Sequence, residues 1–299
     1  MAEQKLRAAK FSIGANTFLI ALKLGVALYT GSLGVLAELA HSSFDLLASV
    51  FAYVGIKKAD EPADETHHYG HERFENVSSL IQTILIAITS LAILWEAYGK
   101  WAGGGHEVVG GWIGLLVMLI ALGVDYVVAK YLHKTADEHG SPALEADAYH
   151  FTTDIWSTLA VIVGLAFAAA GFQIADIAAA VIVALIMLQL SAKLGMKAFL
   201  VMTDKSPDAE TMERVAKIIS SHPKVKGYHT LRGRMAGSLA LIDVSIHLPS
   251  NMSLREAHRI AEELEERVEK GVPFVKEMIV HAEPTSPHDE ERARRKASG

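Results

Sequence analysis

The chain has 299 residues, of which 51% are hydrophobic, and a formal net charge of −6 at pH 7. A mean hydropathy of +0.26 excludes an ordinary soluble protein, and the acidic charge, without a basic stripe among aromatic residues, gives no support for nucleic acid as a partner. Cysteine is absent, which excludes disulfides, thiolate nucleophiles and thiolate ligands, so any metal must be held by imidazole and carboxylate groups.

Long apolar runs fill the first two thirds of the chain. Six of them approach or exceed the roughly 20 residues that cross a hydrocarbon layer of about 30 Å. The charged N-terminus leads into the first run without a signal-peptide cleavage site, so we expect that run to be retained as a span. The predicted spans are Phe11–Tyr29, Leu33–Ile56, Val77–Trp95, Trp112–Tyr131, Ala148–Ala170 and Ile174–Leu194.

Basic residues mark one side of this predicted membrane domain. Lys57, Lys58 and Arg73 follow the second span, and further basic residues flank the first, fourth and sixth spans on the same side. The opposite connections contain only Lys100 as a basic residue. Because short cytoplasmic loops are enriched in Lys and Arg, we expect a multi-pass protein of the cell (inner) membrane with both termini in the cytoplasm.

The second and fifth spans carry the same polar pair. His41 and Asp45 lie at i and i+4 in one span, and His150 and Asp154 do so in the other. Since such residues share a helix face, two pairs on facing helices would offer two imidazole nitrogens and two carboxylate oxygens, a tetrahedral set typical of zinc. Coordination would also offset the roughly 2.5–3.5 kcal/mol that an aspartate costs at bilayer depth. The alternative, hydrogen bonds in helix packing, fits a lone polar residue better than a repeated pair.

Other charges within the predicted spans are not assigned as ligands. Lys23, Asp125 and Asp176 are expected to pair with one another or to line a water-filled cavity. Glu38 and Asp147 lie nearer to the ends of their spans, where we expect them to reach water.

A second group of ligand-type residues lies in the loop between the second and third spans. Asp64, His67 and His71 have ligand-compatible spacing, and Gly70 would let the backbone turn tightly around an ion. The alternative is a solvated polar loop without a metal.

The chain changes character near residue 205, and we predict a membrane domain over 1–204, a cytoplasmic metal-sensing and dimerisation domain over 205–284, and a disordered tail over 285–299. Periodicity predicts an α+β unit of metallochaperone or ferredoxin-like type with the order αββαβ. Its predicted elements are the helices Ala209–Ser221 and Leu254–Lys270 and the strands Lys226–Arg234, Leu239–His247 and Phe274–His281, with a turn over residues 235–238 between the first two strands.

Ligand-type residues recur in this tail domain: His229, His247, His258, His281 and Glu283. Residues at i and i+2 of a strand share a face, so the last two could bind a metal as a pair. The alternative is that these histidines only decorate the surface.

These motifs together resemble the cation diffusion facilitator family of zinc-efflux transporters, and the resemblance covers nearly the whole chain. It rests on the polar pairs and the αββαβ tail described above, on Gly31-Ser32 before the second span, on the run from Pro62 to His71, and on the run from Gly140 to Leu144 before the fifth span.

The resemblance implies a homodimer of six-span protomers in which spans two and five hold the transport site and drive proton-coupled alternating access. It further implies that Asp64, His67 and His71 form a loop site, and that the ligand-type residues of the tail form a two-metal site between paired tail domains. Arg73 and Asp204 match positions that interlock the dimer by a salt bridge in some members.

Two positions depart from common patterns of the family. Many bacterial iron and zinc members have aspartate where this chain has His41, and the replacement of carboxylate by imidazole should favour Zn²⁺ over Mn²⁺ and Fe²⁺. Glu283 stands where aspartate is common in the tail site.

We therefore expect a transporter, not an enzyme, that exports Zn²⁺ from the cytoplasm in exchange for protons. The expected partners are a divalent metal ion, protons, the lipid bilayer and a second copy of the chain, with Zn²⁺ as both transported substrate and regulatory ligand. Export of Fe²⁺, Mn²⁺, Co²⁺ or Cd²⁺ is the alternative within transport. An intramembrane zinc hydrolase or a membrane metal sensor is the alternative from another class, although the sequence has no H-E-x-x-H or G-x-S-x-G motif.

Overall fold

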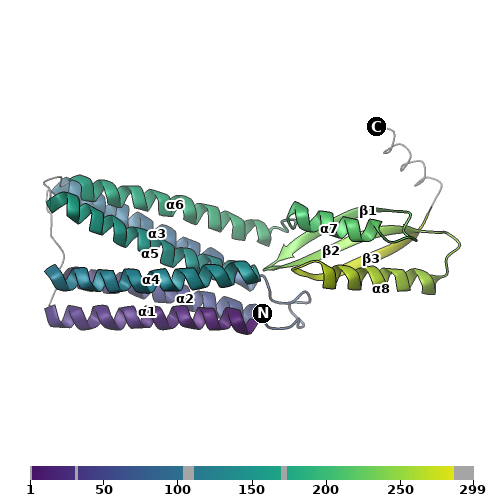
Figure 1. The fold of residues 1–299 in the computed structure, drawn as a ribbon, viewed down its shortest axis with the longest axis horizontal. Helices are drawn as coiled ribbons and strands as arrows, with labels where there is room; N and C mark the ends of the chain where they lie inside the picture. Colours follow the sequence, from purple (N-terminus) through teal and green to yellow (C-terminus); the bar gives the residue numbers. More distant parts are fainter. Residues whose placement is uncertain (1, 31–32, 104–110, 170–173, 286–299) are drawn as a thin grey trace. The chain divides into compact units, whose positions relative to one another are not determined.

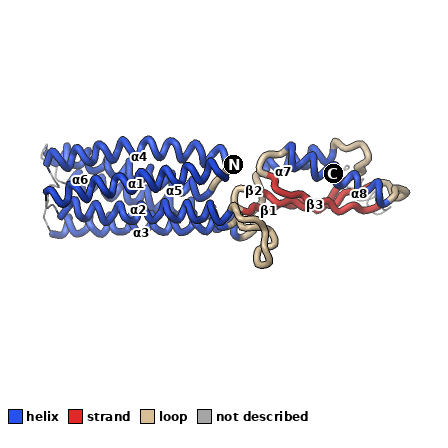
Figure 2. Tube along the Cα trace, turned by 90° about the horizontal axis from the view of Figure 1, so that it is seen from below, coloured by secondary structure: helices blue, strands red, loops and turns tan. Residues whose placement is uncertain are grey.

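The computed structural model describes residues 2–30, 33–103, 111–169 and 174–285, but not the side chains closest to these gaps, which include those of His41 and Asp176. The chain divides into two compact units, Met1–Phe199 and Leu200–Gly299. The first unit is helical, and the second combines helices with a sheet (Figures 1 and 2). The predicted tail lies outside the described residues apart from Thr285.

Helices of 27 to 30 residues make up the first unit, and the last of them runs on into the second. At 1.5 Å per residue each is roughly 40 Å long, which exceeds a hydrocarbon layer of about 30 Å. Each helix covers its predicted span, except that Ala170 of the fifth span lies outside the described residues. Several helices extend beyond the predicted span, because the charged residues next to the apolar run continue the helix. The helices are α1 (Ala2–Thr30), α2 (Leu33–Ala59), α3 (Phe74–Gly103), α4 (Gly111–His139), α5 (Pro142–Ala169) and α6 (Ile174–Met202).

Over the described residues, α1, α3, α4 and α6 are each apolar and long enough to cross a membrane. The helices α2 and α5 have matching lengths and carry the polar pairs. Trp95 and Trp101, at one end of α3, are largely exposed, as aromatic residues are at the boundary between lipid and water.

The helices run side by side in a bundle in which α2 and α5 contact each other (Figure 1). The helix α2 also packs against α1 and α3, and α5 packs against α4, α3 and α1. Gly55 of α2 lies against Ser78 of α3 so closely that a Cβ atom at residue 55 would sit 2.4 Å from the serine Cβ. Small residues at such contacts let helices in a bilayer approach and bond, and Ser78 donates a hydrogen bond to the carbonyl oxygen of Phe51 at 2.7 Å.

The second unit contains a three-stranded sheet with the strand order β1-β2-β3. Strand β1 pairs antiparallel with β2, and β3 pairs parallel with the other side of β2. The hairpin turn is tighter than predicted, because β1 continues to Ala236 and leaves only Gly237 and Ser238 in the turn. Gly237 has φ 61°, the positive value that two-residue hairpin turns require. The elements are α7 (Ala209–Ser220), β1 (Gly227–Ala236), β2 (Leu239–Leu248), α8 (Leu254–Gly271) and β3 (Val275–Pro284).

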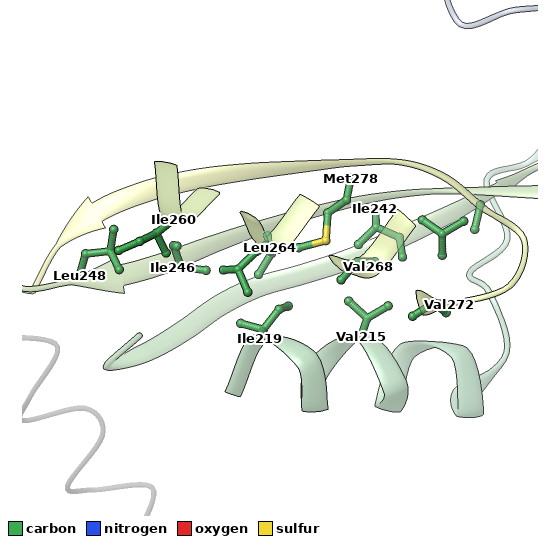
Figure 3. Close-up of a cluster of buried hydrophobic side chains, with 13 residues drawn as sticks. Val215, Ile219, Ile242, Ile246, Leu248, Ile260, Leu264, Val268, Val272 and Met278 are labelled. Carbon is green, nitrogen blue, oxygen red and sulfur yellow. The ribbon is translucent and has the colours of Figure 1, made fainter. Parts of the chain in front are cut away.

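The helices α7 and α8 cover one face of this sheet, and the hydrophobic core lies between these helices and the sheet (Figure 3). The alternation of β2 places Ile242 and Ile246 against the helices, where Ile219 of α7 and Leu264 of α8 meet them. The apolar faces of both helices therefore form the core together with the inward-facing residues of the sheet.

Candidate metal sites

The helices α2 and α5 bring Asp45, His150 and Asp154 together inside the bundle. Nε2 of His150 lies 2.9 Å from Oδ1 of Asp45 and 3.9 Å from Oδ2 of Asp154. One ligand atom from each residue lies within 4.8 Å of the others. Asp45 and His150 are 5% and 1% exposed, so the donors converge in the protein interior. His41 is part of α2 one turn before Asp45, although its side chain is not among those described.

This arrangement suits a cation. Two carboxylates facing one imidazole nitrogen repel each other unless a positive charge lies between them, and the low dielectric of a bundle interior strengthens that repulsion. Either a proton on the imidazole or a metal ion supplies the charge. The two cannot occupy the same nitrogen, so protonation and metal binding exclude each other at His150.

A second layer of polar groups supports these residues from behind. Ser49, one turn after Asp45 on α2, donates a hydrogen bond at 3.0 Å to Oδ1 of Asp147, three residues before His150 on α5. Ser12 and Asn16 of α1 bond to the Ser49 hydroxyl at 2.6 and 2.9 Å. Three helices are thereby tied together close to the ligands.

The expectation that Asp147 reaches water is wrong, because its side chain is fully buried in this layer. The position of Asp147 near the end of its span indicates how deep it lies in the membrane. It does not indicate which neighbouring helices cover its side chain. The i−3 spacing from His150 is the signal that would have placed Asp147 on the inward face. The side chain of Glu38 is not described.

The loop residues Asp64, His67 and His71 also lie together. Oδ2 of Asp64 is 3.3 Å from Nε2 of His71, Oδ1 is 3.7 Å from Nδ1 of His67, and the two imidazole rings are 4.5 Å apart. Gly70 has φ 93°, which a side chain would strain, and this lets the chain fold back. His71 is buried, and its Nδ1 lies 3.0 Å from the carbonyl oxygen of Pro62, an arrangement that directs Nε2 towards Asp64.

Hydrogen bonds prepare Asp64 to act as an anionic ligand. The Thr66 hydroxyl and the backbone N–H groups of His67 and Thr66 all donate to Oδ1. They hold the pKa of the Asp64 carboxyl well below its usual range, the hydroxyl having the largest effect. The carboxyl therefore stays ionised at any pH at which the neighbouring histidines are neutral.

In the second unit, three ligand-type residues, one from each strand, lie close together on the sheet. His229 of β1, His247 of β2 and Glu283 of β3 offer ligand atoms within 4.8 Å of one another. The two imidazoles are in contact, with Nδ1 of His229 lying 2.8 Å from Nε2 of His247. The parallel register that pairs His247 with Glu283 brings the carboxylate alongside.

The remaining predicted ligands of this unit differ in their contacts. His281 lies 3.3 Å from Glu283, as the i, i+2 spacing on β3 predicts. His258 faces Glu262 of its own helix α8 at 3.3 Å and is not among the three residues that meet. Arg73 belongs to the first unit and Asp204, with φ 59°, to the second, so their salt bridge stays a prediction.

Comparison with known proteins identifies both units. The family described as the cation efflux transmembrane domain matches residues 9–203, and the cation efflux protein cytoplasmic domain matches residues 207–285. The chain belongs to the cation efflux family.

Curated members of the cation efflux family match over nearly their whole length. The chain is 30% identical to the cation-efflux pump FieF of Shewanella oneidensis over 277 residues, covering 93% of each chain. It is 27% identical to the cation-efflux pump FieF of Citrobacter koseri over 280 residues, covering 94% of this chain and 93% of that one. Among solved structures, the metal-bound C-terminal domain of the CzcD transporter from Thermotoga maritima is 21% identical with a TM-score of 0.25, covering 25% of this chain and 87% of that one.

Family membership confirms several predictions. The helical unit is a transmembrane domain, the second unit is a cytoplasmic α+β domain, and the protein is an integral membrane transporter and not an enzyme. Divalent metal cation efflux is its function at this level of detail, and the cytoplasmic domain match supports the predicted homodimer. The hydrolase alternative is set aside by the same assignment.

Proposed function

We propose that this cation efflux protein exports Zn²⁺ from the cytoplasm in exchange for protons, through a transport site formed by His41, Asp45, His150 and Asp154. The observation that carries the proposal is the convergence of Asp45, His150 and Asp154 between two helices of the membrane domain. His41 joins them in the proposal because its position one turn before Asp45 places it on the same face of α2.

The donor types favour zinc among divalent metals. Imidazole nitrogen with carboxylate oxygen is a common tetrahedral zinc set, whereas Mn²⁺ and Mg²⁺ prefer oxygen ligands alone. Fe²⁺, Co²⁺ and Cd²⁺ bind similar donors, so direct competition between ions is part of the test.

Exchange with protons follows from the shared nitrogen. Zinc binds neutral imidazole and ionised carboxylate, so metal arriving at His150 displaces a proton and a proton arriving there displaces metal. The ordinary histidine pKa near 6.5 puts this exchange close to physiological pH. With the termini in the cytoplasm and the protein in the inner membrane, metal loads at neutral pH and leaves when the site opens to a more acidic exterior. Such opening requires relative movement of the helices that hold the site.

The other two clusters have a regulatory role in this proposal. The loop site holds metal through Asp64, His67 and His71. The cytoplasmic domain, residues 205–284, pairs with its copy in the homodimer and holds metal through His229, His247, His258, His281 and Glu283. The Arg73–Asp204 salt bridge interlocks the two copies. Metal regulates transport here only if it binds one dimer arrangement more tightly than another.

The test is zinc uptake into proteoliposomes that contain a zinc-sensitive dye and carry a pH gradient. We expect uptake by the parent protein to fall when the gradient is collapsed, and Asp45→Asn and Asp154→Asn to lose it. Ser90→Ala is the matched control, because Ser90 is equally buried and, among the described residues, its hydroxyl bonds only to the carbonyl oxygen of Ile86 in its own helix. Uptake that persists in both aspartate variants contradicts the site, and stronger uptake of Fe²⁺, Co²⁺ or Cd²⁺ in competition contradicts the choice of zinc.

A further inference from the structure

A threonine of the loop between α2 and α3 lies between two of the predicted loop ligands, although the sequence pattern does not assign it to the site. Thr66 comes two residues after Asp64 and directly before His67. Its hydroxyl oxygen lies 2.8 Å from Oδ1 of Asp64 and 2.9 Å from Nδ1 of His67. One hydroxyl group therefore contacts both ligand residues.

The single proton of this hydroxyl decides which nitrogen of His67 can bind a metal. An ionised carboxylate only accepts hydrogen bonds, so the Thr66 hydroxyl donates to Asp64 and must accept from Nδ1 of His67. Nδ1 then carries the proton of the neutral imidazole, and the lone pair lies on Nε2. Thr66 thus prepares His67 to bind a metal through Nε2.

His71 is held in the same tautomer by a different acceptor. Its Nδ1 lies 3.0 Å from the carbonyl oxygen of Pro62, which can only accept, so Nδ1 donates and Nε2 keeps the lone pair. Nε2 of His71 lies 3.3 Å from Oδ2 of Asp64. Two ligand atoms that are each about 2.0–2.1 Å from a tetrahedral zinc ion are roughly 3.3 Å apart, so this spacing suits a shared ion.

The two oxygens of the Asp64 carboxylate have separate roles in this arrangement. Oδ1 accepts hydrogen bonds from the Thr66 hydroxyl and from the backbone N–H groups of Thr66 and His67, which leaves Oδ2 for the metal. Asp64, Thr66 and His67 are all exposed. Without the hydroxyl, water would take its place, and the side chains of Asp64 and His67 would turn more freely.

We propose that Thr66 is the positioning residue of the loop site. Its hydroxyl joins Asp64 to His67 and directs one carboxylate oxygen and one imidazole nitrogen towards the position that Zn²⁺ takes beside His71. Thr66 is not a ligand. It orders two ligands before the metal arrives, which reduces the conformational freedom that is lost on binding. This inference rests on the proposed function, because it assumes that Asp64, His67 and His71 hold zinc.

Two substitutions separate the hydroxyl from the rest of the side chain. Thr66→Val keeps the shape but has no hydroxyl, and we expect it to weaken zinc binding about tenfold, the lower end of the usual effect of groups that orient metal ligands. Thr66→Ser keeps the hydroxyl and should bind zinc within about threefold of the parent. If only the packing of the threonine methyl group mattered, the order would be reversed, because valine keeps that methyl group and serine lacks it.

The experiment measures the Zn²⁺ affinity of the full-length protein in detergent, by competition with a chelating dye at neutral pH. All proteins, including the parent, carry Asp45→Asn, Asp154→Asn and His247→Ala, so that only the loop site of the three proposed sites stays intact. Thr17→Val is the matched control, since Thr17 is also exposed and its hydroxyl donates at 2.7 Å to the carbonyl oxygen of Ile13 in its own helix. Its affinity should stay within about twofold of the parent, because distant residues act independently.

Equal affinities of Thr66→Val and the parent would overturn the inference, and so would equal weakening in Thr66→Val and Thr66→Ser. Asp64→Ala in the same background separates these failures from failure of the proposed function. If Asp64→Ala abolishes the remaining binding while Thr66→Val has no effect, only the positioning role is wrong. If zinc binds to Asp64→Ala as to the parent, the loop site itself is wrong.

Discussion

At the residue scale, the polar layer behind the ligands depends on one hydroxyl. Ser49 is hydrogen-bonded to Ser12, Asn16 and Asp147, and all four side chains are buried. Its removal takes one hydrogen-bond donor from the buried Asp147 carboxylate, which also interacts with Ser12, and takes the acceptor from the Asn16 amide. Groups left unsatisfied in this way cost more than the hydrogen bond itself contributes.

We therefore predict that Ser49→Ala lowers the free energy of unfolding by about 1–3 kcal/mol. Ser90→Ala should cost less than about 1 kcal/mol, because its hydroxyl donates to a carbonyl oxygen of its own helix and no described side chain loses a partner with it. Thermal unfolding of the two purified variants in the same detergent measures the difference. Equal melting temperatures for Ser49→Ala and Ser90→Ala would show that the layer does not stabilise the bundle.

The sequence predicts which candidate ligands come together better than it predicts the groups around them. The i, i+4 spacing is a local rule, so it selects Asp45, His150 and Asp154, whose ligand atoms the structure brings together. Asp147 is assigned to water because a sequence gives its depth but not the helix that covers it. For Lys23 and Asp125 the sequence leaves pairing and a water-filled cavity as two alternatives, and a choice between them requires knowing that α4 packs against α1, which no local pattern states.

At the scale of elements, hydropathy predicts that the helices exist, but it does not predict the residues at which they end. A run of apolar residues reports where a helix crosses lipid, whereas α4 continues as far as His139 because the charged residues beyond the predicted span also favour a helix. In the cytoplasmic unit, periodicity places both helices and all three strands to within three residues. It cannot choose which histidines meet, since the contact between His229 and His247 depends on strand pairing and His258 lies on a helix.

The contact between α2 and α3 gives a prediction about helix packing. Gly55→Ala would bring a methyl group to 2.4 Å from the Ser78 Cβ and 2.8 Å from its hydroxyl, so the helices must separate and the bond from Ser78 to Phe51 must lengthen. Overpacking of this kind costs about 1–3 kcal/mol.

Gly99→Ala in α3 is the matched control, because no atom of the described part of the chain lies within 4 Å of the added methyl group and alanine favours a helix by about 1 kcal/mol over glycine. We expect the melting temperature to fall for Gly55→Ala and to stay or rise for Gly99→Ala. Transport should also slow in the first variant only, because α2 carries half of the proposed site. A melting temperature for Gly55→Ala at or above that of the parent would rule out the close contact.

At the scale of the whole molecule, metal binding and folding are linked. Any ligand that binds the folded protein alone stabilises it, by about 2.7 kcal/mol when its concentration is 100 times the dissociation constant. The proposed transport site joins α2 and α5, so zinc bound there should hold the membrane domain together as one unit.

The dependence of this stabilisation on pH has a definite sign. Zinc requires neutral imidazole, so the metal-bound protein carries fewer protons than the metal-free one, and acid opposes binding. The rise in melting temperature on adding zinc should be present at pH 7.5 and largely lost at about pH 5.5, below the ordinary histidine pKa near 6.5. Thermal scans of the full-length protein in detergent, with zinc or with a chelator, measure the rise at each pH.

The background that lacks the loop and cytoplasmic sites, Asp64→Ala with His247→Ala, assigns the effect to the membrane domain. Adding Asp45→Asn and Asp154→Asn to this background should remove the rise at both pH values, because the two carboxylates that face His150 are gone. A rise that survives in this combined variant would place the stabilising metal elsewhere in the chain. If zinc raises the melting temperature as much at pH 5.5 as at pH 7.5, metal binding is not coupled to proton release. The proposed exchange of zinc for protons would then have no basis, because protons that do not compete with zinc at His150 cannot displace the zinc.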